Sequence, residues 1–286
     1  MFELRIIGIV RRASAWLLDV ILLAVLTTGF MFLISLICNF DGEQALAIEY
    51  DNEWNDYRKE YIADVAEYYG FLYEVSEDGT TYTVTKDGAH ATLNAVIDML
   101  ISDKNRDARM TEAFEAYEQL PPAEVTSNQY RYVLSLLFMM LSVGLLLAYL
   151  ILEFMIPLFL KNGQTVGKKV FGICVVRQNC VKIAPILLFA RTILGKFTVE
   201  TMFPVLLAFL YIFGGMNPIL AIILFVAIFL LNGILFFATK NRTPIHDLFA
   251  GTVAADMRLQ MIFESEEELI EKKKAQHKEF IENSKS

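Results

Sequence analysis

Five ionisable residues lie inside or beside long apolar runs of this sequence: Arg12, Asp19, Glu153, Arg191 and Asp247. An isolated carboxylate inside a membrane costs about 2.5 to 3.5 kcal/mol on insertion scales, so it needs a cationic partner, a proton or a bound cation. The chemistry that such residues could perform is therefore the transfer of protons or cations. The alternative is a buried ion pair that only supports the structure.

A second candidate for chemistry is GQTVGKK, residues 163–169, which has the look of a phosphate-binding loop. Such a loop needs four residues between its first glycine and its Gly-Lys pair, followed by Ser or Thr. Here three residues separate Gly163 from Gly167, and Lys168 is followed by Lys169. The stretch also follows a long apolar run rather than a buried strand. We therefore expect a structural role for it, without a bound nucleotide.

Other kinds of site have little support in the sequence. The chain has three cysteines and three histidines, His90, His246 and His277, and their spacing is not that of a metal site. No nucleophile stands with a base and an orienting group in the pattern of a catalytic site. We therefore expect no enzyme activity, no cofactor, no metal site and no nucleic-acid partner.

The composition indicates an integral membrane protein. Hydrophobic residues make up 55% of the 286 residues, and 22 residues are Phe, which is too much for an ordinary soluble domain. A helix needs about 20 apolar residues to cross the hydrocarbon core. Four runs have about this length: 13–38, 132–160, 197–213 and 219–238. A fifth stretch, 183–197, is interrupted by Arg191 and Lys196, so it is either an interfacial helix or the start of the third span.

The charges of the short loops predict the orientation, because basic loops stay in the cytoplasm. The N-terminal flank carries Arg5, Arg11 and Arg12, and residues 161–199 carry seven Lys or Arg and no acid. The first span contains Asp19 and lacks a small-residue cleavage site after it, so we expect a retained anchor rather than a signal peptide. The sequence thus predicts an all-α polytopic membrane protein with four transmembrane helices and both termini cytoplasmic.

The segment 39–130, between the first two spans, is long enough for a small domain, and we expect it on the extracytoplasmic side. It carries 20 acids and six bases, a net charge of −14. A solvated surface explains this acidity, and the binding of cations or of a basic partner is the alternative. The pattern predicts a small α+β insertion with these elements: a helix over 43–69, a β-hairpin over 71–85 with Asp78-Gly79 in its turn, and a helix over 89–120 that ends at Pro121.

The loop after the second span carries further local signals. Asn162-Gly163 is expected to end the preceding helix. The run KVFGICVV, residues 169–176, and the later run 181–183 predict a short cytoplasmic β-hairpin, in which Gly172 marks a bulge or a close backbone approach. The sequence therefore divides into four parts: the N-terminal flank with the first span (1–38), the insertion (39–130), the membrane region with three further spans and the hairpin (131–257), and a charged tail expected to be a solvated cytoplasmic helix (258–286).

Three motifs resemble those of the RDD family of membrane proteins, which is named for one arginine and two aspartates. RRASAWLLD, residues 11–19, resembles the first-helix signature of that family, and GQTVGKKVFGICVV, residues 163–176, resembles its Gly-x-Thr-x-Gly-Lys block. TPIHDLFAGTVA, residues 243–254, resembles its His-Asp and Gly-Thr block near the C-terminus. The family usually has a shorter loop between its first two spans, so segment 39–130 looks like an insertion.

The resemblance extends to particular residues. It implies that Arg12, Asp19 and Asp247 are the name-giving positions, and Arg191 falls where the family often has an arginine. The remaining motif residues, for which we expect structural roles, are Gly163, Thr165, Gly167, Lys168, Gly172, His246, Gly251 and Thr252. The hairpin turn of the family often contains Asn-Gly or Asp-Gly, whereas Cys180 stands in place of that glycine here. The resemblance therefore does not imply a tight turn at this point.

The two carboxylates within the spans need partners. Arg12 and Asp19 are seven residues apart, roughly 10 Å along one helix face, which is too far for direct contact of their backbones. Glu153 lies in the inner part of the second span, one turn before Pro157. The candidate partners of both carboxylates are Arg12, Arg191 and the cytoplasmic lysines.

Asp247 has different expected surroundings. Thr243-Pro244 is expected to begin a short helix as its cap and first residue, which places Asp247 in or just after the first turn. The helix dipole would stabilise a carboxylate there without any role in transport. A functional role for Asp247 is the alternative.

The leading interpretation is a small cation/proton transporter or exchanger that uses Asp19 and Glu153. The resemblance implies the same, since transport has been proposed within the family. The alternative is a membrane scaffold or accessory subunit that binds partners through the insertion and the tail. The expected partners are the lipid bilayer, protons, monovalent cations, and further copies or a membrane partner subunit. The expected location is the plasma membrane, which the chain crosses several times.

Overall fold

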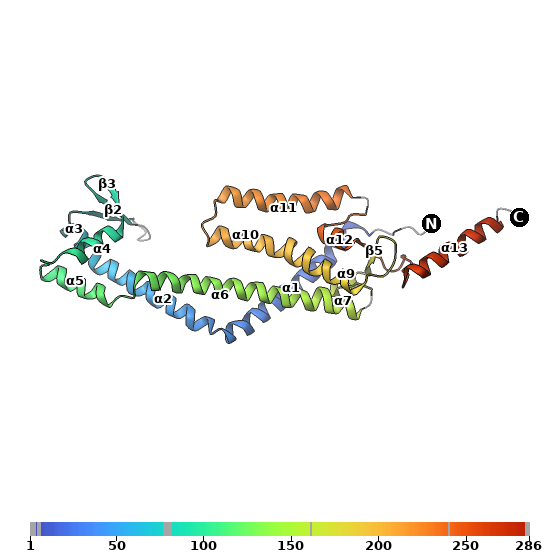
Figure 1. Ribbon diagram of the computed structural model, residues 1–286, viewed down its shortest axis with the longest axis horizontal. Coiled ribbons are helices and arrows are strands. Elements are labelled where there is room, and N and C mark those ends of the chain that lie inside the picture. The colour runs from blue at the N-terminus through green and yellow to red at the C-terminus, as the bar shows by residue number, and fades with distance from the viewer. Residues whose placement is uncertain (1–3, 5–6, 77–81, 161, 240, 284–286) are drawn as a thin grey trace. The chain divides into compact units, whose positions relative to one another are not determined.

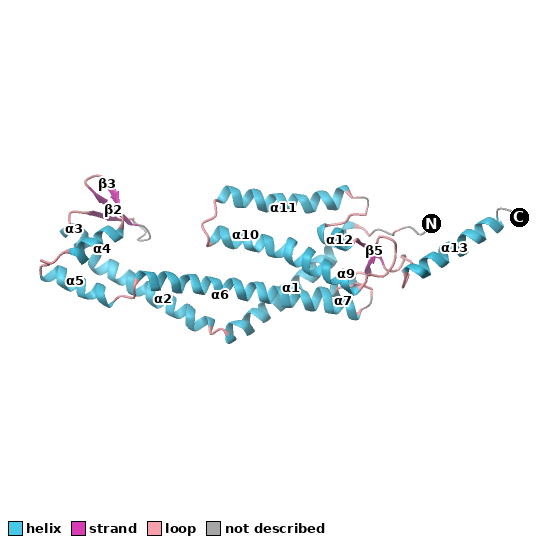
Figure 2. Ribbon diagram, viewed as in Figure 1, coloured by secondary structure: helices cyan, strands magenta, loops and turns pink. Residues whose placement is uncertain are grey.

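The computed structural model describes residues 4, 7–76, 82–160, 162–239 and 241–283. The chain forms two compact units, and Figure 1 colours them by residue number. The membrane unit consists of Met1–Ile37 and Leu137–Ser286, and the inserted unit consists of Cys38–Leu136. Both units are mainly helical, and each contains one small sheet, whose strands are magenta in Figure 2.

Among the described residues, four helical stretches are long and apolar enough to cross a membrane, as the composition predicts. They lie within Ile9–Ile37, Ala108–Phe159, Pro185–Ile212 and Pro218–Ala238. The second stretch also contains a short helix, Ala108–Gln119, which Pro121 and Pro122 separate from its apolar part. Along the last of the four stretches, all of whose residues the structure describes, Ala221 alone is buried. An exposed apolar helix of this kind is stable in lipid, because its backbone groups bond within the helix and its side chains need no water.

The stretch 183–197 is the start of the third span and not a separate interfacial helix. The third span consists of α9 (Pro185–Ala190), the π-helical η3 (Arg191–Met202) and α10 (Phe203–Ile212), which follow one another without a break. Arg191 and Lys196 do not interrupt the helix, because acidic side chains on neighbouring elements compensate their charge. α10 then packs against α11 (Pro218–Ala238), which runs beside it in Figure 1.

The second span ends where the sequence predicts. It consists of α6 (Ala123–Tyr149), the π-helical η2 (Leu150–Met155) and α7 (Ile156–Phe159). The chain then turns at Asn162-Gly163. A Cβ added to Gly163 would lie 3.0 Å from the backbone oxygen of Val175. The glycine therefore lets the following strand pass close to the end of the span.

A two-stranded antiparallel sheet joins the loop after the second span to the segment after the fourth span. β4 (Ile173–Arg177) pairs with β5 (Thr252–Asp256) over their whole length. The predicted hairpin is present only as a single antiparallel bridge between Val176 and Lys182, and the pairing of β4 with β5 was not predicted. Every residue of β5 is buried, so pairing with this distant strand removes more apolar surface from water.

Three shorter helices lie around this sheet: α8 (Val166–Val170), α12 (Ile245–Ala250) and α13 (Glu266–Asn283). α8 packs against α1 (Ile9–Ile37), and α12 packs against η3. α13 is the helix predicted for the charged tail. The start of the first span, the sheet and the segments beside it share a small apolar core that includes Ala15, Ile173 and Ala254.

The inserted unit packs helices on a three-stranded antiparallel sheet. Its first helix runs through α2 (Phe40–Tyr57), the π-helical η1 (Arg58–Ile62) and α3 (Ala63–Tyr68). Its strands are β1 (Leu72–Val75), β2 (Tyr82–Lys86) and β3 (Ala89–Ala91), in that order across the sheet. The predicted hairpin is confirmed by the pairing of β1 with β2. Its predicted Asp78-Gly79 turn lies outside the described residues.

The predicted helix over 89–120 is wrong in two places. Residues 89–91 form β3, and two helices follow it, α4 (Leu93–Ser102) and α5 (Ala108–Gln119). Thr92 and Asp107 cap these helices, because each side chain accepts a hydrogen bond from a first-turn amide that has no partner within its helix. These two caps, rather than the apolar periodicity, set the boundaries.

The inserted unit has its own apolar core. Val65 and Leu100 are fully buried in it. Trp54 and Tyr57 are buried beside them, and Trp54 Nε1 donates to the carbonyl oxygen of Pro121 at 2.9 Å. The unit therefore has the interior that an independently stable domain requires.

We expect residues 39–130, expressed alone, to fold in solution and to give a circular dichroism spectrum with both helix and strand. Leu100→Ala should lower the free energy of unfolding of this fragment by about 2 to 5 kcal/mol, because it leaves a cavity in the core. Met99→Ala is the matched control, since Met99 is exposed, and it should change the free energy of unfolding by less than about 0.5 kcal/mol. A random-coil spectrum at neutral pH would contradict an independent domain.

Candidate functional site

Charged side chains gather at one end of the membrane unit, where the second and third spans meet α8 and α12. Ion pairs, hydrogen bonds and electrostatic interactions connect them. We call this set the charge network: Arg12, Asp19, Glu153, Lys168, Arg191, Lys196, Glu200, His246 and Asp247. The charge network contains all five of the charged residues that the sequence singles out. The fold brings these five residues together from four separate segments: α1, η2, η3 and α12.

Glu153 of η2 faces two lysines. Lys196 of η3 donates from Nζ to Glu153 Oε1, and Lys168 Nζ of α8 lies 3.9 Å from Glu153 Oε2. Glu153 Oε2 and Lys168 Nζ are buried atoms without a hydrogen-bond partner among the described residues. We call these three residues the Glu153 cluster. One carboxylate in it faces two amines, so full protonation leaves an excess positive charge inside the protein.

This excess charge changes the protonation of Lys168. Burial lowers the pKa of the Lys168 ammonium group, and nearby Lys196 lowers it further, while Glu153 compensates only in part. The pKa of Lys168 falls from 10.5 to about 7. Lys168 is therefore close to half-protonated near neutral pH, whereas an exposed lysine is fully protonated there.

Arg191 and Asp247 form a buried ion pair between η3 and α12. Arg191 Nε donates to Asp247 Oδ1 at 2.8 Å, and the two side chains are 1% and 4% exposed. Thr252 of β5 donates from Oγ1 to the same carboxylate oxygen at 2.7 Å. Burial by itself raises the pKa of Asp247, but Arg191 and these hydrogen bonds outweigh it and hold the pKa well below its ordinary value. The pair is therefore fully charged at neutral pH.

The surroundings of Asp247 differ from those that the sequence suggests. Pro244 is the N-cap residue of α12 and not its first helical residue. No capping hydrogen bond joins the Thr243 side chain to a backbone amide of α12 among the described residues. The Asp247 carboxylate points to Arg191 on the third span. The expectation that the helix dipole is the main partner of Asp247 is wrong, because a full positive charge lies in direct contact with the carboxylate.

His246, beside Asp247, binds an acid of the third span. His246 Nδ1 lies 2.9 Å from both carboxylate oxygens of Glu200, and the His246 backbone amide donates to Glu200 Oε1 at 3.2 Å. Burial lowers the pKa of His246, and Asp247 offsets this only in part. The ring is therefore neutral at neutral pH, with its proton on Nδ1, where it can be donated to Glu200. A Cβ added to Gly195 would lie 2.5 Å from His246 Cα, so this contact of α12 with η3 requires a glycine.

The winding of η3 brings Arg191 and Glu200 to the same face of the helix. The two residues are nine positions apart. Nine residues make about two turns of a π-helix, at roughly 4.4 residues per turn, but about two and a half turns of an α-helix. An α-helix would point the two side chains in opposite directions, whereas the π-helix turns both toward α12. Short π-helical segments are frequent at functional sites.

Asp19 of α1 binds neutral donors. Its Oδ2 accepts from Thr165 Oγ1 at 2.5 Å, and its Oδ1 accepts from the Gly167 amide at 2.8 Å. A Cβ added to Gly167 would lie 2.2 Å from the backbone oxygen of Ala15, so α8 lies directly against α1. The Thr165 hydroxyl and the Gly167 amide of the GQTVGKK motif are thus bound to Asp19. The motif fixes α8 against the first span, and α8 carries Lys168 into the Glu153 cluster.

Arg12, one of the expected partners of Asp19, binds elsewhere. It donates from Nη1 to the Arg242 carbonyl oxygen at 2.8 Å and from Nη2 to the Ala254 carbonyl oxygen at 2.7 Å. Arg12 thus connects the start of the first span to the segment after the fourth span. Arg191, the other expected arginine partner, pairs with Asp247. Lys168 and Lys196 pair with Glu153, and Lys168 also interacts electrostatically with Asp19.

Two motif glycines end short helices. Gly172 follows α8 with a φ of +64°, and Gly251 follows α12 with a φ of +59°. This left-handed conformation costs little for glycine and is common just after a helix. Gly172 is therefore a helix end and not a bulge, and the expected backbone approach is present, because the Met257 amide donates to the Gly172 carbonyl oxygen at 3.1 Å. Cys180, in place of the family's turn glycine, has a φ of +65° and adopts the same left-handed conformation despite its side chain.

Several members of the site were missed from the sequence. Lys196 and Glu200 lie in the third span, and the rule that singled out Glu153 applies to them equally. Arg11 and Asp256 form a further ion pair at 2.6 Å, between the first span and β5. No local pattern signals that pair, because 245 residues separate its members. Among the residues that the structure describes, no group of three or more His, Cys, Asp or Glu side chains is placed to hold a metal ion.

Four membrane-length apolar helices with a buried charge network at one end define a polytopic membrane protein. The sequence model of the RDD family matches residues 110–251, which begin after the first span and include Glu153, Arg191 and Asp247. The chain belongs to the RDD family. A search of curated proteins and a search of solved structures each found no match.

Proposed function

We propose that this RDD family protein exchanges protons for monovalent cations, with Lys168 as the proton carrier and Glu153 as the cation ligand. The observation that carries the proposal is the pair of buried atoms without hydrogen-bond partners, Lys168 Nζ and Glu153 Oε2, which lie 3.9 Å apart. Buried polar atoms are costly when unpartnered, and a bound cation would satisfy the carboxylate oxygen.

The exchange follows from charge balance in the Glu153 cluster. When Lys168 is protonated, two ammonium groups face one carboxylate, and the cluster has a net charge of +1. When Lys168 releases its proton, Glu153 Oε2 no longer faces an ammonium group and can bind a monovalent cation, which restores the same net charge. One proton is thus exchanged for one cation. The exchange is electroneutral, so a membrane potential should not drive it.

The other members of the charge network have supporting roles in this proposal. Asp19 holds α8 through Thr165 and Gly167, so it positions Lys168 instead of carrying the cation itself. The Arg191–Asp247 pair fixes α12 to the third span. Glu200 lies on the same face of η3 as Arg191, and its contact with His246 is a second link between η3 and α12.

We further propose that the charge network lies at the cytoplasmic face of the plasma membrane. The basic residues of the N-terminal flank and of the loop after the second span support this orientation. The inserted unit would then lie outside. Four spans offer little protein interior for a pathway, so a homo-oligomer is the form that we expect to work in the membrane.

We expect the purified protein in liposomes to move protons outward when Na⁺, K⁺ or Li⁺ is added outside, as measured with a pH-sensitive dye trapped inside. Lys168→Met should abolish this exchange, because the proton carrier is gone. Lys169→Met is the matched control, since Lys169 is the exposed neighbour of Lys168, and it should leave the exchange unchanged. Exchange by the wild type should be half-maximal near the Lys168 pKa of about 7.

The alternative function is a membrane scaffold or accessory subunit that binds partners through the inserted unit and α13. The inserted unit, with its own core, favours this alternative. A scaffold would show no flux in liposomes that contain this protein alone. Wild-type exchange that persists in Lys168→Met with the same pH dependence would overturn the role proposed for this lysine.

A further inference from the structure

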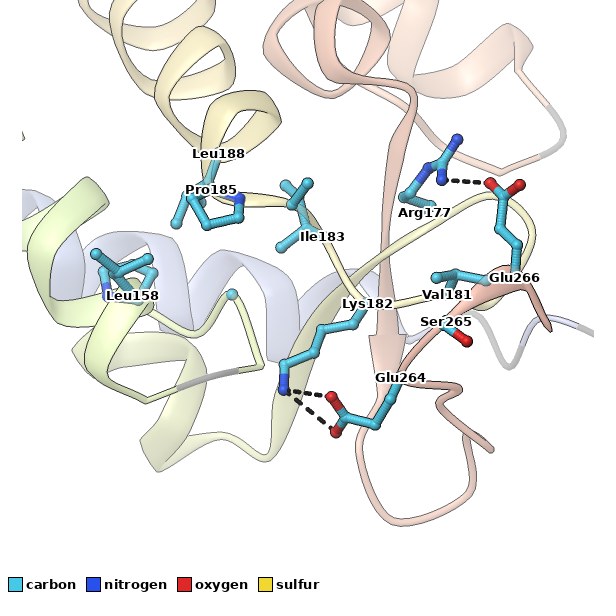
Figure 3. Close-up of a pocket in the computed structure, with 13 residues that line it drawn as sticks. Leu158, Arg177, Val181, Lys182, Ile183, Pro185, Leu188, Glu264, Ser265 and Glu266 are labelled. Carbon is cyan, nitrogen blue, oxygen red and sulfur yellow. Dashed lines mark hydrogen bonds and ion pairs between the residues drawn. The ribbon is translucent and has the colours of Figure 1, made fainter. Parts of the chain in front are cut away.

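A pocket of about 600 Å³ lies at the membrane unit's charged end, and no member of the charge network lines it. Figure 3 shows it between the end of the second span, the start of the third span and the segment that leads into α13. Leu158 of α7 and Leu188 of α9 belong to its apolar wall, with Pro185 beside them. Because these residues are at the ends of two spans, the pocket lies where the hydrocarbon meets the polar headgroups.

Lys182 and Arg177 also line the pocket, and each pairs with a tail carboxylate that lines it too. Lys182 pairs with Glu264 at 2.9 Å, and Arg177 pairs with Glu266 at 2.5 Å, as the dashed lines in Figure 3 show. The two cationic side chains point away from each other in Figure 3, so one small anion cannot contact both. The Lys182 side chain is 22% exposed, whereas its partner Glu264 is 76% exposed. Lys182 thus belongs to the pocket wall, and Glu264 reaches it from the solvent side.

Such ion pairs are easily replaced. An ion pair with an exposed partner contributes little to stability, because water and salt screen it. A phosphate group carries more acceptor oxygens than a carboxylate and binds Arg and Lys through charge-assisted hydrogen bonds. A phosphate that enters the pocket can therefore displace Glu264 from Lys182.

We propose that this pocket binds an anionic phospholipid, whose headgroup phosphate contacts Lys182 while its acyl chains lie along Leu158 and Leu188. The combination of a cation with an apolar wall at the level of the membrane interface fits an amphiphile, and cationic side chains between spans bind such headgroups. Glu264 competes with the lipid for Lys182. Ion transport plays no part in this inference.

The test measures the binding of fluorescent phosphatidylglycerol to the full-length protein in phosphatidylcholine nanodiscs. Lys182→Gln should weaken binding about tenfold, the effect of losing one charge-assisted hydrogen bond. Glu264→Gln should strengthen binding, by up to about fivefold, because the competitor is removed. Lys278→Gln is the control for a general loss of positive charge, since Lys278 is exposed on α13, and it should bind as the wild type does.

The opposite directions of the two effects separate this proposal from a structural role of the ion pairs. A purely structural pair would make both Lys182→Gln and Glu264→Gln neutral or harmful to binding, and that result would overturn the proposal. Lys182→Arg keeps the positive charge and should keep binding, which controls for misfolding of Lys182→Gln. Glycerol phosphate in solution should compete weakly. Competition as strong as that of the lipid would overturn the assignment to a lipid and indicate a site for a free phosphate.

Discussion

Asp247→Asn is expected to lower the free energy of unfolding by about 3 to 5 kcal/mol, because it leaves the Arg191 guanidinium buried without a counter-charge. The side chains have almost the same shape, so the loss would report charge and not packing. Denaturation of the purified protein in detergent micelles measures this effect. The yield of folded protein should fall in the same direction.

Two further variants complete this experiment. Arg191→Gln combined with Asp247→Asn should recover part of the loss, because the uncompensated charge is then removed. Asp256→Asn is the matched control, since its partner Arg11 is half-exposed, and it should cost less than about 1 kcal/mol. A loss below about 1 kcal/mol for Asp247→Asn has the size of a helix-dipole contact, and it would contradict a buried ion pair.

The Glu153 cluster gives a second large effect, and its two variants should act in opposite directions. Glu153→Gln leaves Lys168 and Lys196 buried without a carboxylate, and we expect it to lower the free energy of unfolding by about 3 to 5 kcal/mol. Lys168→Met removes the excess charge and leaves Glu153 paired with Lys196. We expect this variant to be as stable as the wild type or more stable at pH 6.

The pH dependence of the free energy of unfolding provides the check on this prediction. The pKa of Lys168 is about 7 in the folded protein against 10.5 for an ordinary lysine. Between these values the unfolded chain binds the proton that the folded protein has released, so the contribution of Lys168 to stability rises with pH from about 7 upward. Below pH 7 both states are protonated, and the full cost of burying the charge remains. The free energy of unfolding of Lys168→Met should not rise with pH in this way. If the variant has the same pH profile as the wild type, the excess positive charge in the Glu153 cluster is contradicted.

Local patterns in the sequence predicted most of the helices and part of the sheets. The four spans follow from apolar length alone, because a helix that crosses a membrane satisfies its own backbone and needs only apolar side chains. The hairpin of β1 and β2 follows from alternating side chains over a few residues. The apolar period does not predict a helix boundary that a capping side chain sets. Thr92 is an example, because it follows β3 and caps the first turn of α4.

Long-range pairing could not be predicted in the same way. The run that becomes β4 has a nearby candidate partner in residues 181–183, yet it pairs with β5, about 80 residues away. The choice depends on how much apolar surface each pairing buries, and that quantity depends on the arrangement of the spans. The hydrogen bond from Arg12 to the Ala254 carbonyl oxygen also depends on the arrangement of the spans, because 242 positions separate the two residues.

The sequence by itself determined that Glu153 and Asp19 need partners, because a carboxylate within a membrane span is too costly to remain alone. The tertiary structure decided which partners they have. Asp19 accepts from Thr165 and Gly167 since α8 lies directly against α1. Glu153 faces Lys168 and Lys196 since α8 and η3 both pack beside η2.

The winding of the third span is the clearest example of this division. A reading with 3.6 residues per turn places Arg191 and Glu200 on opposite sides of the helix, and it gives them no common function. The π-helical winding of η3 places both toward α12, where Asp247 and His246 bind them. The sequence does not reveal this winding, because a pattern with 3.6 residues per turn does not place these two side chains together.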